Sequence, residues 1–326
     1  MQVILTIDTE TYPLSPGWME DGLRRDLARD VYGKTSSGRS VGLTYQLQVL
    51  RRHRLQAVFM VESLFAASPQ VGIGPLRQIV QEIRAGGHDV QLHPHPEWLP
   101  FIPALRVPLR THLISDYTAD EQAAIIKLAA DMLMAAGAEK PIAFRAGDFA
   151  ATPATLAALA MNGLAIDCSY NRAYVPRLCR VGDVKCLGRG TLIAGIWEFP
   201  VAGFEDFPRH FRPAQLAACS FQELRHSLEQ AHALGWQTFV IVSHSFEMLK
   251  NRRSARREVS VRDSVVARFE KLCAYLDQHR GRFTTATFSG MDLGSLREDV
   301  DCPPLRGRLL NTGVRLYDQL RDRFGR

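Results

Sequence analysis

The segment Gly87-His88-Asp89-Val90-Gln91-Leu92-His93-Pro94-His95-Pro96-Glu97-Trp98 gathers three imidazoles and two carboxylates. Its Asp89–Leu92 part is typical of a strand that follows a glycine turn. A residue before proline is disfavoured in the α region, so His93 and His95 are expected to be extended. Side chains two apart in an extended chain point the same way, so both imidazoles can face one point. This pattern favours a first-row metal held through neutral ring nitrogens, and the alternative is two exposed loop histidines between prolines.

Length and composition indicate an ordinary globular enzyme. The 326 residues can form one large core or two smaller ones, and 46% are hydrophobic and 23% charged. The formal net charge of +6 allows weak attraction to anionic partners and does not indicate nucleic acid. The basic loop 250–257 is interpreted as a solvated face rather than an anion site.

The start of the chain and the cysteines bear on the compartment. Residues 1–7 lack a secretory signal pattern, and no apolar run approaches the roughly 20 residues that span a bilayer. The six cysteines form no Cys-x-x-Cys pair, so they are expected to be reduced thiols. We therefore expect a cytoplasmic protein without stable membrane insertion.

Strand and helix patterns alternate along most of the chain. Strands are expected at 2–7, 56–61, 89–92, 141–144, 164–166, 238–242 and 282–287, and helices at 41–52, 76–85, 118–137, 152–163, 221–234 and 261–279. Thr118 and Ser220 are the expected N-caps of two of these helices. The alternation predicts an α/β fold with mostly parallel strands. A hairpin is expected around 192–199, and long loops at 11–40 and 98–117 are expected over one mouth of the fold.

Polar side chains recur at the C-terminal ends of the predicted strands. They are Asp8, Glu10, His93, Arg145, Asp167 and His244. In a barrel of β/α units these ends converge on one mouth, where active sites are built. A structural role is easy to grant to any one of these residues, but six at equivalent places indicate a functional site.

Five short motifs resemble those of the polysaccharide deacetylase family, also called NodB-like or carbohydrate esterase family 4. In chain order they are Thr6–Glu10, Gly87–His93, Phe144–Gly147, Asp167–Ser169 and Val242–His244. The similarity is strongest to the WalW-like subgroup linked to lipopolysaccharide biosynthesis. The resemblance implies a distorted (β/α) barrel of about seven strands, with a single NodB-like domain over 1–290 and a basic C-terminal helical extension over 291–326.

The resemblance implies one divalent metal ion, with Zn²⁺ expected. Glu10 and His93 match the family's acidic ligand and first histidine ligand, although Thr9 interrupts the usual pair of consecutive acids. The family's second histidine lies four residues after the first, where this chain has Glu97. Because Pro96 keeps His95 out of the α region, His95 is preferred as the third ligand. Glu97 stays open as a ligand or as an acceptor for a ring N–H.

The same resemblance implies hydrolysis of the amide of an N-acetylated sugar or sugar conjugate. Asp8 would be the general base, Arg145 would keep it ionised, and His244 would be the general acid. Asp167 is expected to hold the tautomer of His244. Two alternatives remain, namely hydrolysis of a non-sugar amide at the same site and a catalytically inactive glycan-binding homologue.

The C-terminal tail contains one more pattern of helical spacing. Val314, Leu316 and Leu320 predict a basic amphipathic helix. Such a helix can pack on the body, bind a partner or lie on an anionic surface. Packing on the body is the expectation.

Overall fold

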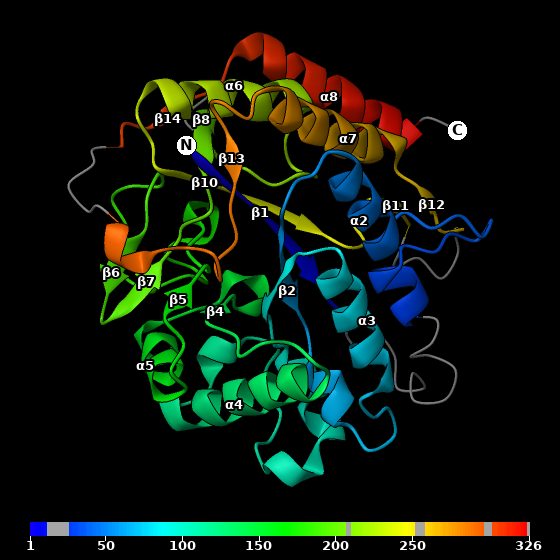
Figure 1. The fold of residues 1–326 in the computed structure, drawn as a ribbon, viewed down its shortest axis with the longest axis vertical. Coiled ribbons are helices and arrows are strands. Elements are labelled where there is room, and N and C mark those ends of the chain that lie inside the picture. The colour runs from blue at the N-terminus through cyan, green and yellow to red at the C-terminus, as the bar shows by residue number, and fades with distance from the viewer. Residues whose placement is uncertain (12–25, 207–209, 252–257, 297–301, 325–326) are drawn as a thin grey trace.

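A curled, mostly parallel sheet runs through the middle of the molecule and is surrounded by helices (Figure 1). The computed structural model describes residues 1–11, 26–206, 210–251, 258–296 and 302–324. The strands of the sheet lie in the order β10 (Thr238–His244), β1 (Gln2–Thr9), β2 (Val58–Val61), β3 (Asp89–Leu92), β4 (Ala143–Phe144), β5 (Ile166–Asp167), β7 (Ile196–Glu198) and β6 (Thr191–Ile193), and β13 (Thr284–Thr285) also pairs with β1. Neighbouring strands are parallel except β6 and β7, which form the expected hairpin.

The central strands form because their residues are buried and apolar. In β1 every residue after Gln2 is buried, and all four residues of β2 are buried. Strands covered on both faces read as continuous hydrophobic runs, which is the pattern that the sequence showed. The sheet curls into a half-barrel of a single domain, and isolated bridges from Val201 and Gln215 reach β10 along its open edge. The predicted α/β barrel of the NodB-like type is therefore confirmed.

Seven α-helices cover this sheet within the described residues. They are α2 (Leu43–Arg52), α3 (Gly74–Ala85), α4 (Ala119–Ala135), α5 (Pro153–Met161), α6 (Phe221–Ala233), α7 (Asp263–Gln278) and α8 (Leu309–Phe324). Thr118 and Ser220 form the expected capping boxes, each with a glutamate three residues later. None of these helices is both long and apolar enough to cross a membrane.

The 98–117 segment is more structured than a plain loop. It carries the 3₁₀ turns η4 (Pro96–Phe101), η5 (Pro103–Leu105) and η6 (Ile114–Asp116). Trp98 anchors it, because its ring packs 5.9 Å from that of Phe65 and its Nε1 donates to the carbonyl of Thr11 at 3.0 Å. Residues 12–25 of the other predicted loop and residues 252–257 of the basic loop lie outside the described residues.

Two small sheets accompany the main one. β11 (Leu249–Lys250) pairs with β12 (Ser260–Val261), and β8 (Gly203–Asp206) lies between β9 (His210–Pro213) and β14 (Leu305–Arg306). The sequence did not predict β8, β9 or β14. They are short, and β14 pairs with a strand that lies about a hundred residues earlier in the chain, which local patterns cannot reveal.

The thiol prediction is wrong for two of the six cysteines. Cys186 and Cys302 form a disulfide across 116 residues of sequence. The other four, Cys168, Cys179, Cys219 and Cys273, are free and buried. The disulfide and β14 both fasten the segment before α8 to the body, so the C-terminal part packs against residues of the barrel. The boundary at residue 290 remains a prediction.

Candidate metal centre and catalytic residues

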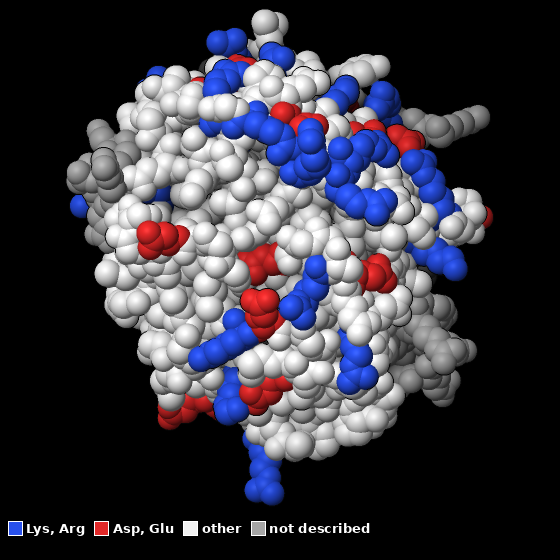
Figure 2. Space-filling model, viewed as in Figure 1, with Lys and Arg blue, Asp and Glu red and all other residues white. Residues whose placement is uncertain are grey.

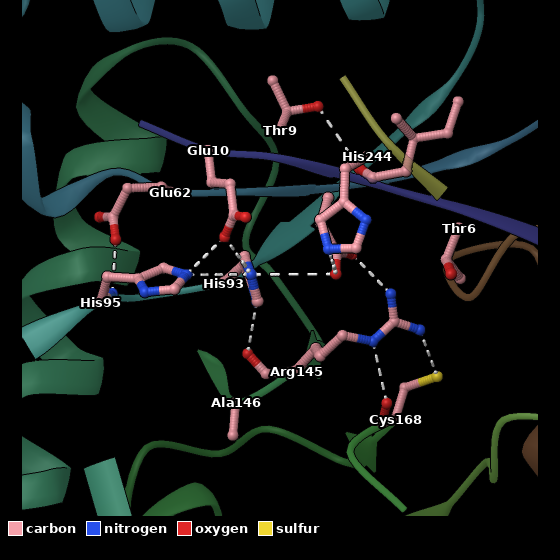
Figure 3. A network of polar contacts seen from close by, with 12 residues as sticks. Thr6, Thr9, Glu10, Glu62, His93, His95, Arg145, Ala146, Cys168 and His244 are labelled. Carbon is pink, nitrogen blue, oxygen red and sulfur yellow. Dashed lines mark hydrogen bonds and ion pairs between the residues drawn. The ribbon is translucent and has the colours of Figure 1, made fainter. Parts of the chain in front are cut away.

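Three predicted ligands meet at the mouth of the half-barrel. The Nε2 atoms of His93 and His95 lie 2.9 and 2.5 Å from Glu10 Oε2, and 3.2 Å from each other. All three side chains are buried, and their ligand atoms fall within 4.8 Å of one another. Figure 3 shows Glu10, His93 and His95 pointing at one another, with His244 and Arg145 beside them. The structure thus brings together the three residues that the sequence proposed.

Local backbone geometry explains why two histidines on one segment can converge. His95 is extended, with φ −117° and ψ 116°, and the turn η4 begins at Pro96 as the proline pattern predicted. The rings of His93 and His95 are nearly perpendicular, at 86°, with centroids 4.8 Å apart. Glu62, at the end of β2, fixes the backbone by accepting from the N–H of His95 at 2.5 Å.

The second nitrogen of each histidine has a partner that suits metal binding. His93 Nδ1 lies 3.0 Å from the carbonyl oxygen of Arg145, which can only accept, so Nδ1 carries the proton and Nε2 has the lone pair. His95 Nδ1 lies 3.5 Å from Glu97 Oε2. Metal-binding histidines ordinarily donate their other N–H to a carbonyl or carboxylate, as His93 does. The donor set therefore fits a divalent ion, and Glu97 lies on the outer side of His95.

Electrostatics keep the carboxylate of this cluster ionised. Burial alone would raise the pKa of Glu10, but the charge of His95 and the close contacts with both imidazoles hold it well below its usual range. The pKa of His95 is raised well above its usual value, because the charge and hydrogen bond of Glu10 outweigh the opposing effect of burial. A cation is thus favoured at the point where these groups meet.

Asp8 and Arg145 form a buried ion pair beside the cluster. Arg145 is fully buried, and its Nη1 donates to Asp8 Oδ1 at 2.6 Å. Its Nε donates to the carbonyl of Cys168 at 3.0 Å, so the guanidinium is fixed at two points. The other oxygen, Asp8 Oδ2, lies 3.9 Å from His93 Nε2 and 3.7 Å from His244 Nε2. Asp8 therefore lies between the Glu10–His93–His95 cluster and His244, with one oxygen paired to Arg145.

His244 is oriented by a residue that the sequence analysis missed. Its Nδ1 lies 2.9 Å from Glu247 Oε1, in the turn that follows β10. Burial alone would lower the pKa of His244, but the hydrogen bond and charge of Glu247, with smaller contributions from the charges of Asp8 and Glu10, raise it to about 9. His244 is therefore protonated near neutral pH, with Nε2 on the side of Asp8. The His-x-x-Glu spacing was visible in the sequence, but nothing there placed the glutamate on the ring.

The expectation that Asp167 orients His244 is wrong, because Glu247 occupies that position. Asp167 accepts from the hydroxyl of Ser169 at 2.5 Å and lies beside Glu198, and both carboxyl groups are fully buried. Burial raises the pKa of Asp167, and burial together with the neighbouring Asp167 raises that of Glu198 well above its usual value. Ser169 in turn accepts from the N–H of Ala146, so this pair supports the backbone next to Arg145.

The metal-site candidates, Asp8 and His244 line one cavity of about 370 Å³. Its polar wall contains Asp8, Glu10, His93, His95 and His244, and its other wall contains Phe149, Tyr174 and Phe246. The rings of Phe149 and Tyr174 lie 5.2 Å apart. Asp148 and Phe149 are consecutive residues with positive φ, 52° and 58°, a conformation that is rare outside glycine and clusters at functional sites.

Comparison with known proteins supports the fold. No protein-family model matches the sequence, and no curated protein matches it. Among solved structures, a presumed polysaccharide deacetylase from Mycobacterium smegmatis matches with a TM-score of 0.57 and 18% identity, over 94% of this chain and 93% of that one.

Two further structures match less closely. A family 4 carbohydrate esterase from Streptomyces lividans has a TM-score of 0.43 and 12% identity, over 89% of this chain and 93% of that one. A family 4 pseudoenzyme from Bacillus anthracis has a TM-score of 0.41 and 10% identity, over 89% and 65%. The chain has the fold of the Mycobacterium smegmatis protein along almost its whole length.

Proposed function

We propose that the protein is a metal-dependent N-deacetylase that hydrolyses the acetamide of an N-acetylated sugar or sugar conjugate. The observation that carries the proposal is one cavity that holds a buried carboxylate–imidazole–imidazole cluster, an arginine-paired aspartate and a protonated histidine. The proposal includes three more specific points: membership of the WalW-like subgroup, a role in surface polysaccharide or lipopolysaccharide biosynthesis, and Zn²⁺ as the bound ion.

The geometry of the cavity supports the following roles for its residues. A divalent ion held by Glu10, His93 and His95 would supply Lewis-acid polarisation of the acetyl carbonyl. Asp8, paired with Arg145, accepts the proton of the attacking water.

His244 then completes the reaction on the leaving-group side. It donates its Nε2 proton to the leaving amine, while Glu247 stabilises the imidazolium before transfer. Water is consumed, the C–N bond breaks, and acetate and the free amine are formed.

The cavity favours a sugar ring as the substrate. Its aromatic wall offers apolar faces for the C–H side of a ring, and His112 and Asp148, 3.3 Å apart at the rim, offer polar partners for hydroxyl groups. We propose a nucleotide- or lipid-linked sugar in the cytoplasm as the physiological form. The Cys186–Cys302 disulfide would be unusual in that compartment, so cell fractionation combined with thiol labelling tests this part.

The test combines metal content with product analysis. We expect near-stoichiometric metal by mass spectrometry in the wild type and in Glu97→Ala, with loss in His93→Ala and in His95→Ala. Acetate release from N-acetylglucosamine oligomers is expected to fall by at least about a hundredfold in Asp8→Asn, which keeps its metal.

Three outcomes would contradict parts of this scheme. Absence of metal after addition of zinc would overturn the metal site. Metal without turnover of any N-acetylated sugar would indicate an inactive binding protein. Release of formate or turnover of a small cyclic amide instead of acetate would indicate a non-sugar amidase.

A further inference from the structure

Helix α8 packs on the body of the protein through its polar face. Arg315 is buried, and its guanidinium lies 2.6 Å from Asp206 and 3.0 Å from Glu223. The hydroxyl of Thr312 donates to the other oxygen of Asp206 at 2.9 Å. The amide of Asn311 donates to the carbonyl of Gln222 at 3.3 Å. Polar contacts and ion pairs therefore dominate the inward face.

The two carboxylates that the structure describes on α8 also point inward. Asp318 lies 3.5 Å from Arg268, and Asp322 lies 2.9 Å from Arg262, both on or next to α7. Each acid of this helix thus has an arginine of the body as its partner. Neither contributes a free negative charge to the outer face.

Five large apolar residues of α8 face outward instead. Their exposed fractions are Leu309 66%, Leu310 85%, Leu316 50%, Tyr317 64% and Leu320 57%. A helix on a globular protein ordinarily buries such a stripe against the core and exposes its polar face. The expectation that α8 packs on the body is confirmed, and the reversed orientation of the helix leaves an apolar row at the surface.

Exposed arginines border this row. Arg306 and Arg308 lie at the start of α8 and Arg321 lies near its end, all exposed. Arginines at a helix start lie beside the positive end of the helix dipole, which is unfavourable for the helix alone. Figure 2 shows Lys and Arg gathering over the region of α7 and α8 in the upper part of this face. The surface thus complements a partner that is both anionic and apolar.

We propose that α8 docks the protein on an anionic lipid bilayer. The leucines and Tyr317 enter the boundary between headgroups and acyl chains, and the arginines contact lipid phosphates. Peripheral binding fits this helix, which has 16 residues and is too short and polar to span a bilayer. A second copy of this protein fits less well as the partner of α8. Antiparallel pairing of two α8 helices would place Arg308 of one near Arg321 of the other, without acidic residues between them.

Vesicle flotation with the full-length protein tests this proposal. The wild type is expected to float with vesicles of phosphatidylcholine and phosphatidylglycerol, and to bind pure phosphatidylcholine and high-salt samples much more weakly. The double variant Leu316→Gln/Leu320→Gln should lower the partition coefficient by about a hundredfold, roughly tenfold for each leucine withdrawn from the lipid. Leu192→Gln, at a similarly exposed leucine of β6 (48%), is the control and should bind as the wild type does.

The remaining measurements distinguish lipid docking from a loss of folding and from self-association. Circular dichroism melts of the double variant should match those of the wild type, because the substituted side chains are exposed and the ion pairs of α8 are untouched. Arg308→Gln/Arg321→Gln should weaken binding to anionic vesicles only. If the leucine double variant floated with anionic vesicles as well as the wild type does, the proposal would be overturned. The proposal would also be overturned if the wild type did not bind vesicles but formed a concentration-dependent dimer in sedimentation velocity, and the leucine variant abolished that dimer.

Discussion

Replacing Glu247 by glutamine should move the basic limb of the pH–rate profile. Glu247 Oε1 lies 2.9 Å from His244 Nδ1, and its hydrogen bond and charge raise the pKa of that histidine to about 9. A charge this close contributes roughly one to three units, so the neutral amide should bring the pKa down to about 7. Glutamine keeps an acceptor for the ring, so the imidazole stays in place.

The sign of the effect follows from the proposed role of His244 as a general acid. Raising the pH through its pKa removes the proton that the leaving amine needs, so activity falls on the basic side. In Glu247→Gln this loss should begin about two pH units earlier. At about pH 8 the variant should be slower by roughly tenfold, while the two enzymes converge towards about pH 6.

The assay is kcat/KM for acetate release across the pH range, with Gln215→Ala as the matched control. Gln215 Nε2 donates to Glu247 at 2.7 Å, so its removal disturbs the same carboxylate but leaves its charge. We expect no shift of the limb in this control. An unchanged limb in Glu247→Gln, or an equal shift in Gln215→Ala, would refute the assignment of Glu247 as the partner that sets the pKa of His244.

Three further results are expected. Thiol titration in denaturant without reductant should find four thiols of the six cysteines, because Cys186 and Cys302 are paired, and six would contradict this. Gly147→Ala should lower metal affinity about tenfold, because the added Cβ would lie 2.8 Å from the ring of His95, and unchanged affinity would show that the ring can move aside. Arg315→Met should lower the free energy of unfolding by about 3 kcal/mol in chemical denaturation, because two buried carboxylates each lose one charged partner while Asp206 keeps Arg212. Arg315→Lys should lose less, and equal losses would contradict a stabilising role for the ion pair.

The features that local physics determines could be predicted from the sequence. The apolar run of β1 predicts a buried strand, and Thr118 with Glu121 predicts a helix start. Pro96 excludes a helical turn at His95, and the structure shows that residue extended. The convergence of His93 and His95 follows from the two-residue period of an extended chain, which needs no tertiary information.

The features that the sequence analysis missed depend on distant partners. Glu247, and not Asp167, contacts the ring of His244, because the turn after β10 brings Glu247 there. Cys186 and Cys302 are 116 residues apart in the sequence, so only the tertiary structure brings their sulfur atoms together. The orientation of α8 is set by buried carboxylates of the body, and a helical pattern alone cannot show which face they attract.

The left-handed turn at Asp148 and Phe149 has a consequence for the stability of this protein. Each such residue costs about 1–3 kcal/mol when it is not glycine, and Phe149 is also held by Arg145, whose guanidinium carbon lies 5.9 Å from its ring centre. Glycine or asparagine at either position would relax the backbone, so selection for heat resistance alone would favour that exchange. The same exchange at Phe149 would remove an aromatic wall of the cavity. Phe149 therefore links a local cost in backbone stability to the shape of the cavity.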